Sequence, residues 1–312
     1  GSATPSLESL HNAHAGRYAL LKLTQRAGGA QPPRFLRLDI KSLPLDSGIS
    51  GPLQQAIKQT LAAGQQVLVF LNRRGFAPTL LCHDCGWISQ CPRCDARMTV
   101  HQRSGELRCH HCGYSERSPR NCPDCAKVDL RPLGAGTERA EERLEILFPD
   151  TPVLRIDRDS TTRKGAMDQL LTTIHHGEPC ILVGTQMLAK GHHFPRVTLV
   201  AILDADGGLF SADFRASERM AQLIVQVAGR AGRAEEAGRV IIQTHLADHP
   251  LLVQLTEQGY FAFAEQALAE RRGAGLPPFC HLALLRAEAH KPGQAEGFLD
   301  EACSEAELLL NE

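Results

Sequence analysis

The stretch Gln66-Val67-Leu68-Val69-Phe70-Leu71 decides the fold class of this chain. Its last five residues are all apolar and the run is short, which is typical of a strand rather than a helix. A strand with one face in water would alternate apolar and polar residues, so this run predicts a strand that is buried on both faces. Such strands belong to parallel sheets with helices on both sides.

Similar short apolar runs recur along the chain and alternate with helical patterns. This alternation predicts an α/β fold with a mostly parallel sheet covered on both faces. The expected strands are residues 18–23, 35–40, 66–71, 153–156, 180–184, 197–203 and 240–244, and the expected helices are residues 53–63, 137–148, 164–175 and 217–228. From Pro250 to Arg272 the pattern turns helical, and the Gly- and Pro-rich residues 273–278 mark a boundary.

The composition excludes several classes of protein. The 312 residues carry 34 basic and 35 acidic side chains, a net charge of −1, so any nucleic-acid contact must come from local basic patches. No run of 18 apolar residues and no basic-then-apolar leader is present, so we expect no membrane contact and a cytoplasmic location.

Eight of the eleven cysteines occur as four Cys-x-x-Cys pairs. The spacing lets two thiolates bind one ion from a tight turn, so four pairs predict two structural zinc sites with four thiolates each. The pairs are Cys82/Cys85, Cys91/Cys94, Cys109/Cys112 and Cys122/Cys125. A disulfide framework is the alternative, and it requires an oxidising compartment that nothing in the sequence indicates.

Loop lengths indicate which pairs share an ion. Five residues separate Cys85 from Cys91, too few to fold back, whereas fourteen separate Cys94 from Cys109, enough for two strands and a turn. We therefore predict an inner site nested within an outer one. The inner site is Cys91, Cys94, Cys109 and Cys112, and the outer site is Cys82, Cys85, Cys122 and Cys125. The alternative is a cross-brace that joins Cys82/Cys85 to Cys109/Cys112.

A glycine- and arginine-rich segment is the second strong pattern, Gln226-Val227-Ala228-Gly229-Arg230-Ala231-Gly232-Arg233. Its glycines allow close approach to a ligand, and two arginines three residues apart can reach phosphates from one side of a turn. An arginine presented across a domain interface stabilises charge on a γ-phosphoryl group in transfer.

The segment Gly184-Thr185-Gln186-Met187-Leu188-Ala189-Lys190-Gly191-His192 directly follows an expected strand. Open α/β sheets bind ligands at the carboxyl ends of their strands. A hydroxyl and nearby backbone amides suit phosphate oxygens, so this segment is a second candidate site.

These segments resemble known motifs. Residues 2–4 (Ser-Ala-Thr), 184–191 and 226–233 are similar to motifs III, V and VI of superfamily 2 helicases, and residues 70–76 stand where motif IV would. Eight cysteines inserted just after that point resemble one family of that superfamily, the primosomal replication restart DNA helicases. Residues 72–87, 184–195 and 210–215 are very similar to that family.

The resemblance implies a RecA-like second lobe, with a two-zinc insertion, of an ATP-dependent 3′-to-5′ DNA helicase. That helicase remodels stalled forks so that a primosome can assemble and the replicative helicase can be reloaded. The implied partners are forked and single-stranded DNA, other primosome proteins and single-strand binding protein, in the bacterial cytoplasm at the nucleoid.

The same resemblance implies roles for individual residues. Ser2 and Thr4 would link hydrolysis to lobe movement. The catalytic residues facing ATP would be Arg230, Arg233 and Gln226, and those that contact the nucleotide or couple it to DNA would be Gly184, Thr185, Lys190, Gly191 and Gly229.

The phosphate- and Mg²⁺-binding motifs Gly-x-x-x-x-Gly-Lys-Ser/Thr and Asp-Glu-x-His are absent from the sequence. We expect the lobe that grips ATP and Mg²⁺ to precede Gly1, both ends to be cuts in a longer protein, and this chain to hydrolyse no ATP alone. The expected division is residues 1–23 (end of the first lobe and linker, with motif III), 24–78 and 131–272 (second lobe), 79–130 (zinc-binding insertion) and 273–312 (start of a truncated C-terminal domain).

Two rival interpretations remain. The chain is either a DNA- and partner-binding zinc module with a vestigial motor, or part of a translocase that moves on duplex DNA without unwinding it. The two arginines of residues 226–233 disfavour the first, because a binding module has no γ-phosphate for them to face. The zinc insertion disfavours the second.

Overall fold

The computed structural model describes residues 1–23, 31–71, 79–94, 96–101, 104–132, 140–156, 166–185, 194, 196–209, 213–232, 238–283, 285, 287, 289, 291 and 293–310. The chain divides into two compact units, residues 1–268 and residues 269–312, and each is described by itself.

A six-stranded parallel sheet forms the centre of the first unit, in the order β1-β13-β12-β4-β11-β10. Its strands are β1 (Arg34–Asp39), β4 (Gln66–Leu71), β10 (Val153–Ile156), β11 (Ile181–Gly184), β12 (Val197–Leu203) and β13 (Arg239–Thr244). Strand β4 lies between β12 and β11, and all six of its residues are buried. The parallel α/β fold predicted from residues 66–71 is therefore confirmed.

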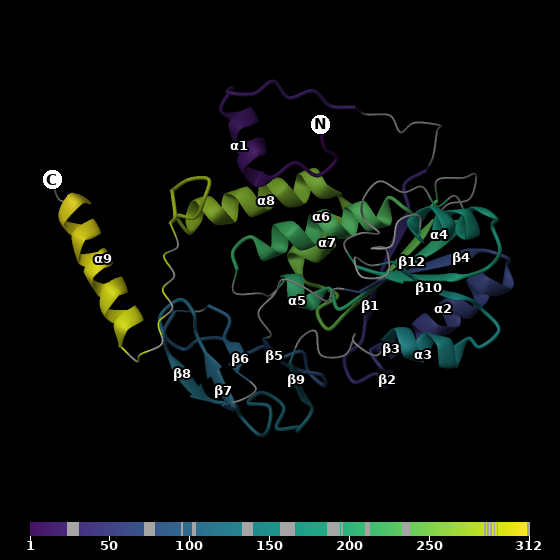
Figure 1. Ribbon diagram of the computed structural model, residues 1–312, viewed down its shortest axis with the longest axis horizontal. Helices are drawn as coiled ribbons and strands as arrows, with labels where there is room; N and C mark the ends of the chain where they lie inside the picture. Colours follow the sequence, from purple (N-terminus) through teal and green to yellow (C-terminus); the bar gives the residue numbers. More distant parts are fainter. Residues whose placement is uncertain are drawn as a thin grey trace. The chain divides into compact units, whose positions relative to one another are not determined.

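Helices cover both faces of the sheet (Figure 1). On one side lie α2 (Gly51–Ala62) and α3 (Ala140–Leu147), and on the other lie α4 (Ala166–His175) and α6 (Ala216–Ala228). Val67, Val69 and Leu71 pack with Leu53 of α2 and Leu144 of α3. Since side chains alternate along a strand, the intervening apolar residues of β4 serve the opposite face, which explains the unbroken apolar run.

One expected strand was wrong. Residues 18–23 form no strand, and Leu21 and Leu23 are 90% and 99% exposed. An apolar run becomes a strand only where a neighbouring strand satisfies its backbone groups, and no described strand pairs with this one. The segment instead follows helix α1 (Leu7–His14) as irregular chain.

The helical stretch from Pro250 to Arg272 consists of two helices, α7 (Pro250–Glu257) and α8 (Tyr260–Gly273). Gly259 separates them with a φ of +87°, a left-handed conformation that ends the first helix. A short helix, α5 (Asp206–Leu209), precedes α6.

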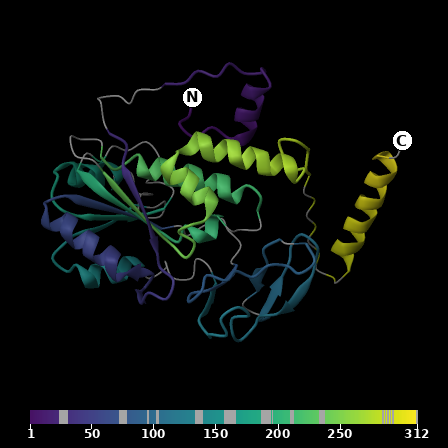
Figure 2. The same ribbon diagram turned by 180° about the vertical axis from the view of Figure 1, so that it is seen from behind.

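The cysteine-rich region, drawn in blue in Figure 2, follows β4 in the chain and folds as small antiparallel sheets beside the large sheet. Strands β5 (Leu80–Cys82) and β9 (Leu130–Pro132) pair at its base, and β6 (Thr99–His101), β7 (Glu106–Arg108) and β8 (Ser115–Arg117) form a three-stranded sheet. Strands β6 and β7 are the two strands predicted between Cys94 and Cys109. A separate hairpin, β2 (Leu45–Asp46) and β3 (Ile49–Ser50), precedes α2.

In the second unit, the last residues of α8 lead to α9 (Gln294–Leu310). Arg271 donates a hydrogen bond to the carbonyl of Pro277, and the Arg272 guanidinium lies 4.8 Å from the centre of the Phe279 ring. Across the described part of the chain, every helix is too short or too polar to cross a bilayer.

Candidate zinc centres and motor motifs

Four Cys-x-x-Cys turns share one local geometry. In each, the N–H of the first cysteine donates to the carbonyl five residues later, at 2.7 to 2.8 Å. The residue after the second cysteine has a positive φ in three described turns, at Gly86 (+83°), Gly113 (+74°) and Ala126 (+61°). This left-handed position reverses the chain, so both sulfurs of a pair point to the same side. The four donors are Cys82, Cys91, Cys109 and Cys122, and their acceptors are Trp87, Ala96, Tyr114 and Lys127.

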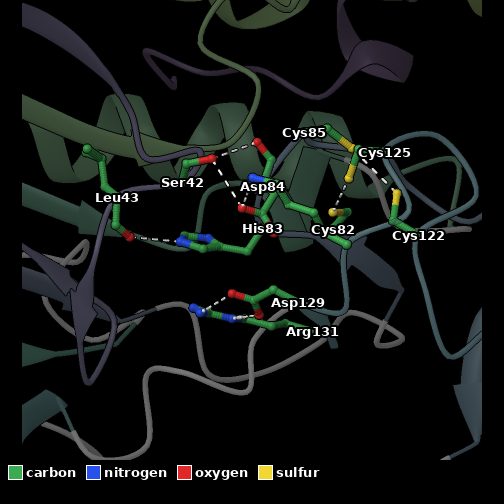
Figure 3. Close-up of polar contacts among 11 residues, drawn as sticks. Ser42, Leu43, Cys82, His83, Asp84, Cys85, Cys122, Cys125, Asp129 and Arg131 are labelled. Atoms are coloured by element: carbon green, nitrogen blue, oxygen red, sulfur yellow. Dashed lines mark hydrogen bonds and ion pairs between the residues drawn. The ribbon is translucent and has the colours of Figure 1, made fainter.

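The turns bring the eight cysteines into two groups of four, and within each group the sulfurs lie within 4.8 Å of one another. One group is Cys82, Cys85, Cys122 and Cys125; the other is Cys91, Cys94, Cys109 and Cys112. This is the nested arrangement, and the cross-brace is not formed. Figure 3 shows the outer group, in which Cys82 faces Cys125 and Cys85 faces Cys122.

The sulfur separations fit zinc. Facing sulfurs are 3.6 Å apart in the outer group and 3.5 Å apart in the inner group. Sulfurs at the corners of a tetrahedron around Zn²⁺ would be roughly 3.8 Å apart, given a Zn–S bond of about 2.3 Å. A disulfide would need about 2.05 Å, so the disulfide alternative does not fit.

Burial raises the pKa of the Cys85 thiol to about 12, with hydrogen bonds from the neighbouring thiols adding to the effect. A bound Zn²⁺ reverses this, because a coordinating thiol loses its proton outright. The two tetracysteine groups therefore suit two zinc ions. Four thiolates also fill the tetrahedral coordination, so no position is left open for a substrate.

The inner group has a small core of its own. Met98 and Leu107 are fully buried with Cys91 and Cys109, and Trp87 packs against them. The only tryptophan thus contributes to packing around the inner site. The Arg93 guanidinium lies 4.8 Å from the centre of the Tyr114 ring, so a residue from each of the two inner turns takes part in a cation–π contact.

The segment that resembles motif V begins at the carboxyl edge of the large sheet. Gly184 is the last residue of β11 and is buried, and Thr185 follows it directly. The remaining candidates of this segment, Lys190 and Gly191, lie outside the described residues.

Motif VI lies at the end of α6. Gln226 is on the helix, Gly229 caps it, and Arg230 is 9% exposed. The N–H of Gly232 donates to the carbonyl of Val197, the first residue of β12. The described part of the segment that resembles motif VI therefore ends near the amino edge of the sheet, opposite the edge where Gly184 and Thr185 lie. Arg233 lies outside the described residues.

Gln226 binds motif III rather than standing free. Its side-chain amide donates to the hydroxyl of Thr4 at 3.1 Å, and Thr4 is buried. One turn earlier, Gln222 donates to the Thr4 carbonyl at 3.4 Å, and one turn before that, Glu218 accepts from the N–H of Leu7 at 3.0 Å. Motifs III and VI thus meet directly.

Sequence reasoning missed Glu218, Gln222 and Tyr260, which hold residues 4–7 on α6. The Tyr260 hydroxyl donates to the carbonyl of Pro5 at 2.6 Å. The available signal was the four-residue spacing of Glu218, Gln222 and Gln226, which places three polar side chains on one face of the helix.

Two family models match the chain. The model for the PriA DNA helicase Cys-rich region matches residues 91–117, and the helicase conserved C-terminal domain matches residues 135–235. Among solved structures, yeast Dbp5 bound to RNA and ADP BeF3 aligns over 96% of this chain and 53% of its own, at 13% identity and a TM-score of 0.38, a likeness too distant to support an argument.

Curated relatives match almost the whole chain. The replication restart protein PriA of Haemophilus influenzae is 54% identical over 301 residues, which cover 96% of this chain and 41% of the relative. That of Bacillus subtilis is 43% identical over 290 residues, 91% of this chain and 36% of the relative. The chain thus spans about two fifths of the length of these relatives. It belongs to the PriA family of replication restart proteins and contains the Cys-rich region of that family and a helicase C-terminal domain.

Proposed function

We propose that this chain is the second motor lobe, with its zinc-binding insertion, of an ATP-dependent 3′-to-5′ DNA helicase. The whole helicase would recognise and remodel stalled forks, so that a primosome assembles and the replicative helicase is reloaded. Family membership supports the helicase class. The direct contact between Thr4 of motif III and Gln226 of motif VI is the observation that carries the proposal, because it gives a physical link between two motor motifs.

In the proposed motor, Arg230 and Arg233 stabilise the negative charge on the γ-phosphoryl group of ATP, which a preceding lobe holds with Mg²⁺. Gln226 responds to that change in charge and transmits it to Thr4 through the hydrogen bond between their side chains. Because Thr4 is buried, a movement of Gln226 moves Thr4 with it. Gly229 lets the backbone approach the nucleotide. Hydrolysis by this chain alone is not expected, because it lacks the ATP-gripping motifs.

Gly184 and Thr185 lie at one edge of the sheet and Gly232 lies near the other, which supports a division of labour. Gly184 and Thr185, at the carboxyl edge of the sheet, would contact the DNA backbone together with Lys190 and Gly191. Motif VI, near the amino edge, would face the nucleotide. One lobe with two such edges can turn a change at the nucleotide into a displacement along DNA.

The eight paired cysteines would hold two structural zinc ions, and the zinc supplies folding free energy to an insertion with few apolar residues. The proposed partners are forked and single-stranded DNA, other primosome proteins and single-strand binding protein. The names of the relatives, all replication restart proteins, support this assignment. The proposed place of action is the bacterial nucleoid.

The test is ATP hydrolysis by the full-length parent protein, with and without forked DNA. Arg233→Ala should lower the fork-stimulated rate by roughly a thousandfold, the scale of an arginine acting on a γ-phosphoryl group. Arg219→Ala is the matched control, since Arg219 is an arginine of α6 that pairs on the surface with Asp213. Its rate should stay within about twofold of the wild type.

A rate that ignores DNA, or that survives Arg233→Ala, would favour the rival function of a DNA- and partner-binding zinc module. In that case the isolated chain should still bind forked DNA with its zinc in place, and the Thr4–Gln226 contact would be structural only.

A further inference from the structure

Three buried polar side chains connect the outer zinc site with the large sheet. His83 lies between Cys82 and Cys85, His245 follows β13, and Asp206 begins α5. Nδ1 of His83 is 2.8 Å from Nε2 of His245, and Nδ1 of His245 is 2.8 Å from Oδ2 of Asp206. All three are at most 8% exposed.

Both ends of this chain of hydrogen bonds are anchored to oxygen. Nε2 of His83 lies 2.8 Å from the carbonyl of Leu43, which can only accept (Figure 3). Asp206 accepts from the hydroxyl of Thr244 and from the N–H of His245 as well as from the His245 ring.

The acceptors at the two ends fix the direction of the outer hydrogen bonds. Nε2 of His83 donates to the Leu43 carbonyl, and Nδ1 of His245 donates to Asp206. The third hydrogen bond lies between Nδ1 of His83 and Nε2 of His245, so the two histidines form one continuous hydrogen-bonded chain from Leu43 to Asp206.

Backbone contacts support the same junction. The N–H of Ser42 donates to the carbonyl of His83, and the N–H of His83 donates to the carbonyl of Asp129. Gly86, the last residue of this turn, lies so close to the sheet that an added Cβ would be 3.3 Å from the carbonyl oxygen of His245. The turn is thus seated on the carboxyl end of β13 and on the loop after β1.

We infer that Asp206, His245 and His83 are positioning residues that form a buried strut, which fixes the zinc-binding insertion on the motor lobe. The strut begins at α5, between the end of β12 and helix α6, which carries motif VI. Movement of α6 therefore reaches the insertion through buried hydrogen bonds, which are costly to break. This use of the strut rests on the proposed helicase function, whereas its effect on the outer zinc site does not.

The first experiment measures zinc release from this chain to a chromogenic chelator. His83→Leu and His245→Leu remove the strut, and each should release one of the two zinc ions at least about tenfold faster. His83→Gln keeps an acceptor and a donor at similar spacing and should release zinc at nearly the wild-type rate. His110→Leu is the matched control, because exposed His110 has the same place in the inner turn as His83 in the outer one.

The second experiment uses the full-length parent and measures base pairs unwound per ATP hydrolysed. Both leucine variants should keep DNA-stimulated hydrolysis within about twofold and lose about tenfold in unwinding. The double variant should be no worse than either single one, because the two changes break the same chain of hydrogen bonds. His83→Gln should restore unwinding.

The results distinguish a failure of the proposed helicase function from a failure of the strut. A wild type without DNA-stimulated hydrolysis overturns the proposed function, while the zinc-release result still decides the strut. Wild-type zinc release in both leucine variants overturns the strut. If the leucine variants do not fold, Asp206→Asn decides: it keeps the shape of the side chain but replaces one of the two oxygens that accept hydrogen bonds from Thr244 and His245, so unchanged zinc release would overturn the strut.

Discussion

The inner and outer zinc sites have the same four ligands and nearly the same sulfur geometry, but different support. The inner site stands on its own three-stranded sheet and a small core around Met98 and Leu107. The outer site has its turn held by the large sheet, through His83 and the close approach of Gly86 to His245. Identical metal chemistry therefore supports local folding at one site and attachment to the large sheet at the other.

Loss of one zinc ligand should have the largest effect, and it should affect the inner and outer sites differently. Cys109→Ser should lower the zinc content from two ions to about one and unfold β6–β8, since a structural zinc supplies much of the folding free energy of such a region. The outer site and the large sheet should persist. Cys122→Ser should instead release the outer zinc and loosen β5 and β9. Metal analysis and amide hydrogen exchange measure both effects, and loss of both ions from Cys109→Ser would contradict separate support.

The buried carboxyl group of Asp204, which interacts with Asp206, should give the next largest effect. Burial, followed by the charge of Asp206, raises the pKa of Asp204 to about 7, well above its ordinary value of 3.8. The folded protein therefore holds a proton that the unfolded chain releases. The corresponding stability is fully present below about pH 4 and is lost as the pH rises to about 7, by about 1.4 kcal/mol per pH unit.

Asp204→Asn should remove that pH dependence, because an amide does not ionise. It keeps an oxygen for the N–H of Gly207 and tolerates the positive φ of +58° at this position. The variant should become increasingly more stable than the wild type up to about pH 7, and the difference should then level off. Chemical denaturation at several pH values measures this; a constant difference would show that Asp204 is ionised in the folded protein.

The smallest expected effect is a difference in stability between variants of two matching glycines, one in each zinc site. Gly86 and Gly113 follow the second cysteine of the outer and inner turns, and both have left-handed φ values. Alanine costs about 1 kcal/mol in that conformation. A Cβ at Gly113 meets open space, whereas one at Gly86 meets the His245 carbonyl and Lys41.

We therefore expect Gly86→Ala to be more destabilising than Gly113→Ala by about another 1 kcal/mol, in the range of overpacking a close contact. The free energy of unfolding of the two variants measures the difference. Equal losses would mean that the outer turn is no more tightly seated than the inner one.

The sequence predicted most of the sheet, because fully buried parallel strands are continuous apolar runs. Six of the seven expected strands are present, with ends shifted by at most one residue. The seventh, residues 18–23, has the same apolar character, but none of the strands that the structure describes pairs with it. Similarly, Gly259 alone did not reveal that residues 250–272 form two helices, because a single glycine is also tolerated within a helix.

The candidate site residues also include some that the sequence predicted and some that it did not. The eight cysteines and their grouping were predicted because a tetrahedral ion limits loop lengths between ligand pairs. The partners of residues 4–7 were not, since Glu218, Gln222 and Tyr260 reach these residues from more than 200 residues away. The roles of Arg230, Gly184 and Thr185 stay predictions, as do those of Arg233, Lys190 and Gly191.

The sequence by itself therefore determined the parallel α/β class, the two tetracysteine groups and the family, because each depends on short-range spacing or on residue type. Only the tertiary structure decided that Gly184 and Gly232 lie at opposite edges of the sheet, that Thr4 binds α6, and that His83 reaches Asp206 through His245. The side-chain contacts among these join segments 39 to 222 residues apart. The physical reason is that the order and direction of the strands bring such segments together, and local sequence patterns carry no information about which distant side chain completes a hydrogen bond.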